Sequence, residues 1–86
     1  MTVHTFPTLL GDLLRIYRKH RRLDQAEVAR RSGVSKMSIS KIENGILLPS
    51  NELLVKIENA LELNIQSKGI LLGARLELSN QQLVSL

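Results

Sequence analysis

The 86-residue chain contains no cysteine and has a formal net charge of +4. This length fits one domain with a modest core, and a chain without cysteine forms neither a disulfide nor a thiolate metal site. No apolar run reaches the roughly 18 residues that a membrane span needs, and the first residues lack the basic-then-apolar pattern of a signal peptide. We therefore expect a cytoplasmic protein that makes no membrane contact.

The positive charge is concentrated in the first half of the chain. Residues 1–45 carry nine lysines and arginines against four acidic side chains, a net charge of +5, whereas residues 46–86 have a net charge of −1. Such asymmetry is typical of a half that binds a polyanion and a neutral half with another task. Charge alone is explained equally well by an ordinary solvated surface.

Apolar spacing predicts a first helix from about Thr8 to His20, with Pro7 and Thr8 as its start signals. One stripe of this helix is apolar at positions i, i+3, i+4 and i+7, namely Leu10, Leu13, Leu14 and Tyr17. The opposite face carries Arg15, Lys19 and Arg22. The pattern predicts a helix that buries one side and presents cations on the other.

A second, short helix is predicted after Asp24, which stands at an N-cap position with Glu27 three residues later. We expect Ala26 and Ala29 to face inward, where their small side chains allow another helix to come close. Gly33 ends this helix, because glycine readily adopts the left-handed conformation that closes a helix and turns the chain.

The third predicted helix begins after Ser35, its expected cap, and ends at Asn44-Gly45. Ile39 and Ile42 mark its buried side. Its outer surface then consists of Lys36, Met37, Ser40, Lys41 and Asn44. A fourth helix is predicted after the cap Ser50, with a wide apolar stripe made by Leu53, Leu54, Ile57, Ala60 and Leu61.

Several segments taken together resemble the phage repressor and Cro family of helix-turn-helix regulators, also called XRE-like. The resemblance covers roughly residues 8–62. It is carried by the segments Gln25-Ala26-Glu27-Val28-Ala29, Gly33-Val34-Ser35, Ile39-Ser40-Lys41-Ile42-Glu43-Asn44-Gly45 and Pro49-Ser50. It implies an all-α domain of four to five helices, similar to the lambda repressor, whose third helix lies in the major groove of DNA.

The resemblance also assigns roles to individual positions. Base edges would be read by Lys36, Met37, Ser38 and Lys41. Phosphates would be contacted by Gln25, Ser35, Asn44 and Arg22. In similar proteins an arginine of the first helix pairs with a glutamate of the third, which implies a structural ion pair between Arg18 and Glu43.

The segment after the fourth helix departs from the family pattern. Residues 61–66 alternate apolar and polar side chains, which favours a strand over residues 62–67, followed by a turn at Lys68-Gly69 and a second alternating stretch at residues 74–78. The alternative is an amphipathic helix over residues 70–84. We assign residues 1–62 to a helix-turn-helix DNA-binding domain and residues 63–86 to a strand or hairpin tail that mediates dimerisation or binds a partner.

The expected function is sequence-specific binding of double-stranded DNA by a homodimer that represses operators with inverted repeats. A short terminal strand after such a domain is also similar to what is found in the antitoxins of HipA-type toxin modules. The alternative function is therefore an antitoxin whose tail neutralises a toxin protein. We expect no enzyme and no cofactor, because no catalytic set of side chains is apparent. We also expect no metal site, since His4 and His20 are isolated histidines.

Overall fold

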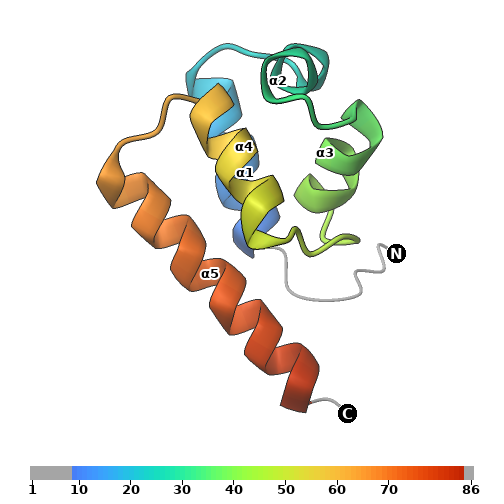
Figure 1. Cartoon of the computed structure of the whole chain (residues 1–86), viewed down its shortest axis with the longest axis vertical. Helices are drawn as coiled ribbons and strands as arrows, with labels where there is room; N and C mark the ends of the chain where they lie inside the picture. The colour runs from blue at the N-terminus through green and yellow to red at the C-terminus, as the bar shows by residue number, and fades with distance from the viewer. Residues whose placement is uncertain (1–8, 85–86) are drawn as a thin grey trace.

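The structure is a computed structural model that describes residues 9–84, with side chains described as far as Leu76. His4, Pro7 and Thr8, which enter the sequence arguments, lie outside the described residues. The described part is all-α and contains no strand (Figure 1). Its helices are α1 (Leu9–His20), α2 (Gln25–Ser32), α3 (Lys36–Glu43), α4 (Asn51–Ala60) and α5 (Ile65–Val84).

Three predicted caps form the expected hydrogen bonds. The side chain of Asp24 accepts the backbone N–H of Glu27 at 2.8 Å, and Ser35 and Ser50 cap α3 and α4 in the same way. Each bond satisfies a backbone donor that the first turn of a helix leaves without a partner. The predicted beginnings of α2, α3 and α4 are therefore confirmed.

A single apolar core lies where the helices meet. Its largest fully buried side chains include Leu10, Ile42, Leu54, Leu61 and Leu71, which come from four helices and the turn after α4. The expectation that Ala26 faces inward is wrong. Ala26 is exposed, and Val28 is the buried residue of α2.

The predicted strand over residues 62–67 is wrong, because α5 begins at Ile65. Glu62 adopts a left-handed conformation, with φ 53°, and Asn64 caps α5 by accepting the N–H of Ser67 at 2.8 Å. The apparent alternation thus runs through a helix end, a turn and a new helix start. Its apolar members do not share one face, since Leu61 is 1% exposed and Ile65 is 87% exposed.

The predicted hairpin is also absent from the described residues, because Lys68 and Gly69 lie inside α5 and the helix continues to Val84. The helical alternative for the tail is the one that the structure supports. Leu71 and Ala74 are buried in the core, so the first half of α5 belongs to the same packed unit as α1–α4.

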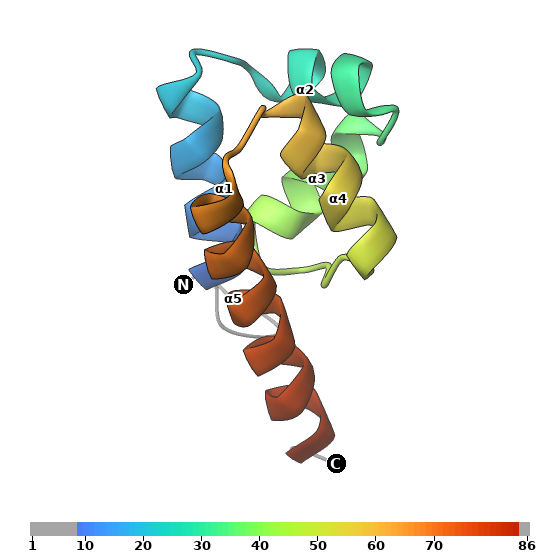
Figure 2. The same ribbon diagram turned by 60° about the vertical axis from the view of Figure 1, so that its left-hand side comes forward.

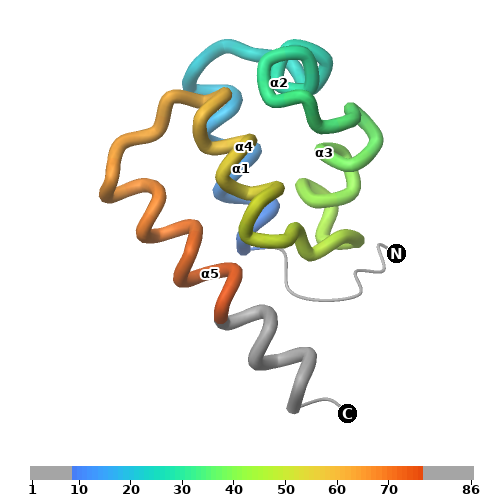
Figure 3. Tube along the Cα trace, in the orientation of Figure 1, coloured from blue at the N-terminus to red at the C-terminus, as the bar shows by residue number. Residues whose placement is uncertain are grey.

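Helix α5 packs beside α1 through its first half. Both ribbon views and the Cα trace show the first half of α5 alongside α1, although the two are far apart in sequence (Figures 1, 2 and 3). Nε of Arg75 donates to the carbonyl of Pro49 at 2.8 Å and fastens α5 to the segment before α4. Within residues 9–84, no helix is both long and apolar enough to cross a membrane.

Candidate nucleic-acid interface

The conformation of the tight turn between α2 and α3 depends on Gly33 and Val34. Gly33 has φ 76°, and its N–H donates to the carbonyl of Ala29 at 2.9 Å, which closes α2. A side chain with a Cβ rarely adopts this conformation, so glycine is favoured here for backbone reasons. Val34 is 5% exposed and anchors the turn in the core immediately before Ser35 caps α3.

Helix α3 buries one side and presents a basic face to solvent. Ile39 and Ile42 are buried, whereas Lys36, Lys41 and the large side chain of Met37 are exposed. Met37 is 67% exposed. The structure therefore brings these three candidate base-reading residues together on the surface of one helix.

Ser38, the fourth candidate, is half-buried and belongs to the cap of α3. Its hydroxyl oxygen accepts a hydrogen bond from the Ser35 hydroxyl at 2.9 Å, while its backbone N–H donates to the Ser35 oxygen. A serine hydroxyl that accepts one hydrogen bond still has its own hydrogen to donate. The side chain of Ser35 holds the first turn of α3.

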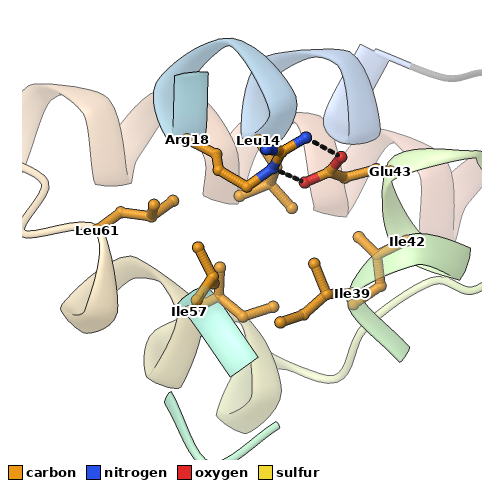
Figure 4. A pocket seen from close by; sticks show the side chains of 8 residues that line it. Leu14, Arg18, Ile39, Ile42, Glu43, Ile57 and Leu61 are labelled. Carbon is orange, nitrogen blue, oxygen red and sulfur yellow. Dashed lines mark hydrogen bonds and ion pairs between the residues drawn. The ribbon is translucent and has the colours of Figure 1, made fainter. Parts of the chain in front are cut away.

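Glu43 at the end of α3 is the most heavily bonded side chain of the site. Its side chain is 2% exposed and accepts two hydrogen bonds from Arg18, at 2.7 and 3.0 Å (Figure 4). Arg18 also donates to the carbonyl of Leu23 at 2.9 Å. This bidentate pair joins α1 to α3 and places the expected partners Arg18 and Glu43 in contact.

The charges of this pair stabilise each other. Burial by itself raises the pKa of the Glu43 carboxyl, but hydrogen bonds from Arg18 and Gln25 and the charge of Arg15 outweigh burial and hold the pKa below its ordinary value. The hydrogen bond to Glu43 raises the pKa of the Arg18 guanidinium. Both groups are therefore ionised at neutral pH, and their charges are neutralised locally.

Gln25, the first residue of α2, is also attached to Glu43. Its Nε2 donates to Oε1 of Glu43 at 3.0 Å, so the start of α2 is tied directly to the end of α3. Sequence reasoning placed Gln25 at a helix N-terminus but did not foresee this bond. Arg22 lies in the turn before α2, where it is exposed and has a left-handed backbone with φ 58°.

Two residues of α1 that sequence reasoning did not single out for the site contact the end of α3. Nη2 of Arg15 donates to the carbonyl of Glu43 at 3.1 Å and to Oδ1 of Asn44 at 3.0 Å. Gly11 lies so close to α3 that an added Cβ would stand 2.5 Å from the carbonyl oxygens of Ile42 and Glu43. Their spacing with Arg18, at i, i+4 and i+7, was the available signal that they share one face.

The core beneath the site has no room for a ligand. A cavity of about 10 Å³ lies between α1, α3 and α4, next to the Arg18–Glu43 pair (Figure 4). That volume is close to the space that one water molecule needs, and the lining side chains are mostly apolar. This cavity therefore cannot hold a ligand larger than a water molecule.

In a comparison with known protein families, residues 14–67 match the model of the helix-turn-helix family. These residues are more than half of the chain and extend from the middle of α1 into the first turn of α5.

Individual proteins are also similar to the chain. One is the ImmF control region 10 kDa protein of Bacillus phage phi105, which is 39% identical over 56 residues; the match covers 65% of this chain and 62% of that protein. Another is the restriction-modification controller protein C.AhdI from Aeromonas hydrophila, known from a crystal structure. It has a TM-score of 0.67 and 24% sequence identity, and the match covers 71% of this chain and 92% of that one. This second likeness concerns the fold.

Proposed function

Because this chain belongs to the helix-turn-helix family, we propose that it is a transcriptional regulator that binds double-stranded DNA sequence-specifically, with α3 as the recognition helix. The observation that carries the proposal is the outer face of α3, where Lys36, Met37 and Lys41 are exposed. The helix is capped by Ser35 at its beginning and joined to α1 by the Arg18–Glu43 pair at its end. A helix presented in this way fits the major groove of B-form DNA.

The electrostatics of α3 favour a polyanion. The acidic residue of the helix, Glu43, is buried and paired with Arg18, so its charge does not face the ligand. Lys36 and Lys41 remain exposed. The surface that would enter the groove is therefore cationic, and binding through it releases counterions and weakens with salt.

Each candidate base-reading residue has a chemical role that suits a base edge. Lys36 and Lys41 donate to O6 or N7 of guanine, Ser38 offers a hydroxyl that pairs with several bases, and Met37 packs on the methyl group of thymine. These four side chains are proposed to determine which sequence is bound.

Phosphate contacts are proposed for Gln25, Ser35, Asn44 and Arg22, which flank α3. Gln25 stands at the N-terminus of α2, where backbone N–H groups and the helix dipole favour an anion, and its bond to Glu43 fixes the direction of its amide. Asn44 is exposed at the C-terminal end of α3. Such contacts hold the helix in register without reading sequence.

A nuclease footprint tests the proposal, with the purified chain on the DNA upstream of its own gene. We expect protection that Lys41→Ala abolishes or relaxes at one position, with a loss of about 1–3 kcal/mol in binding free energy. The matched control is Lys56→Ala, which removes an exposed lysine from α4. If both variants weaken binding equally, or no DNA is protected at moderate salt, α3 is not a reading helix.

The dimer is proposed to form through α5. Ile65, Leu72 and Leu76 follow one another at i, i+7 and i+11 on α5, and they are 87%, 42% and 50% exposed. Gly69 and Gly73 lie between them, and a Cβ at either would have no neighbour within 4 Å. Exposed apolar side chains next to bare backbone fit a second copy of the same helix.

A dimer of this kind would present two recognition helices to half-sites about 34 Å, or one helical turn, apart. Residues 1–62 would supply DNA binding and residues 63–86 the self-association, although Leu71 and Ala74 also complete the core of the first part. Sedimentation at micromolar concentrations tests the dimer, and a chain that stays monomeric both alone and with DNA rules it out.

The antitoxin alternative depended on a terminal strand. The described tail is helical, so that structural argument is removed. Co-purification of a toxin with the chain would restore this alternative.

A further inference from the structure

Arg15 occupies a position between α1 and the C-terminal end of α3 in which its guanidinium meets several acceptors. Nη2 bonds both the carbonyl of Glu43 and Oδ1 of Asn44, and Nε lies 3.5 Å from the Glu43 carboxylate. On the outer side, Nη1 lies 3.7 Å from Asp12. A planar guanidinium suits this arrangement because its donors have a fixed geometry.

The bond to Asn44 determines how the amide of that residue is turned. Its oxygen is directed at Arg15, and its Nδ2 donates to the hydroxyl of Ser40 at 3.4 Å along α3. The nitrogen edge of the amide therefore lies along the α3 side of the residue. A nitrogen edge donates hydrogen bonds and suits a phosphate oxygen, whereas an oxygen edge would repel it.

The backbone around Arg15 allows little adjustment. One turn earlier on the same face, Gly11 stands against the carbonyls of Ile42 and Glu43 with no room for a Cβ. On the same face one turn later, Arg18 donates two hydrogen bonds to the Glu43 carboxylate. The distance from α1 to the end of α3 is thus fixed on both sides of Arg15, so its reach to Asn44 is fixed too.

We propose that Arg15 is a positioning residue for DNA recognition, which acts by orienting the Asn44 amide and holding the C-terminal end of α3. This inference rests on the proposed function. It assigns a task to a cation that the resemblance to known regulators did not single out. It also distinguishes Arg15 from Lys19, which lies one turn later on α1 and is exposed.

A double-mutant cycle tests the role, with operator affinity measured for wild type, Arg15→Met, Asn44→Ala and the double variant. We expect Arg15→Met to weaken binding about tenfold, as for the loss of one charge-assisted hydrogen bond. We expect its effect to fall below about threefold when Asn44 is already alanine, because the two substitutions break the same contact. Lys19→Met removes the same charge from α1 and should cost less than about threefold in either background.

Three further measurements make each outcome decisive. Urea unfolding shows which variants are folded at the assay temperature. Arg15→Lys keeps the positive charge but not the planar arrangement of donors, so this variant should bind with intermediate affinity. If Arg15→Met costs the same factor with and without Asn44, or if Lys19→Met costs as much, Arg15 acts through its charge and the inference is overturned. If the wild-type chain binds no DNA, the proposed function fails first, and this inference fails with it.

Discussion

Replacing Glu43 with alanine tests whether the buried ion pair with Arg18 stabilises the packing of α3 against α1. The substitution removes a carboxylate whose side chain is 2% exposed and leaves the Arg18 guanidinium, 12% exposed, without its main partner. It also removes the acceptor of Gln25. An uncompensated buried charge of this kind costs about 3–5 kcal/mol, a large part of the roughly 5–15 kcal/mol that stabilises a small domain.

Urea unfolding at neutral pH, followed by circular dichroism, measures this cost. The matched control is Glu27→Ala, because Glu27 also accepts hydrogen bonds from two arginines, Arg30 and Arg31, but on the surface of α2. We expect the control to have a much smaller effect, since exposed ion pairs are screened by solvent. Equal losses for the two variants, or a loss below about 1 kcal/mol for Glu43→Ala, would refute the argument.

The same group gives the stability of the domain a pH dependence of known sign. The pKa of Glu43 is lower in the folded chain than its ordinary value of 4.5, so its contribution is complete above about pH 4.5 and is lost as the pH falls through the lowered value. Glu43→Gln has no such titration, so its deficit relative to wild type should shrink in acid. Glu27, whose pKa is lowered to about 2 by Arg30 and Arg31, titrates in both proteins and cancels in the comparison.

Three other substitutions probe packing and burial, each measured by urea unfolding. Gly11→Ala should destabilise the domain by about 1–3 kcal/mol, because the new Cβ meets the last carbonyls of α3. Glu58→Gln should stabilise it at neutral pH, since burial raises the pKa of this carboxyl, and the gain should vanish below about pH 4.5. Gly73→Ala should stabilise α5 by up to about 1 kcal/mol while weakening self-association in sedimentation; an unchanged dimer would contradict the proposed interface.

The beginnings of α2, α3 and α4 could be predicted because their signals are local. A cap and the N–H that it binds lie three residues apart, so Asp24, Ser35 and Ser50 were visible in the sequence. The contacts of Arg15 with Glu43 and Asn44 join positions 28 and 29 residues apart. No local pattern encodes them, because they depend on how α1 comes to lie against α3.

The strand prediction for the tail is wrong because alternation of apolar and polar residues over six positions has two physical origins. It arises in a half-buried strand, and it also arises where one helix ends and another begins. The chain leaves α4 just as it leaves α1, with a left-handed non-glycine residue, then a leucine, then a capping Asp or Asn. The repeated signature is Arg22-Leu23-Asp24 and Glu62-Leu63-Asn64. A comparison of these two segments would have predicted a helix after Asn64, because the first of them precedes a helix that Asp24 caps.

A helical tail also means that the proposed dimer interface can set the distance between the two recognition helices. Helices α3 and α5 lie on opposite sides of α1 and α4, so self-association through α5 leaves the outer face of α3 uncovered (Figure 1). The crossing of two α5 helices would then set the distance between the recognition helices. Substitutions at Leu72 or Leu76 should therefore change the preferred spacing of half-sites, whereas those at Lys36 or Lys41 should change the sequence read within each half-site, because the two surfaces are separate.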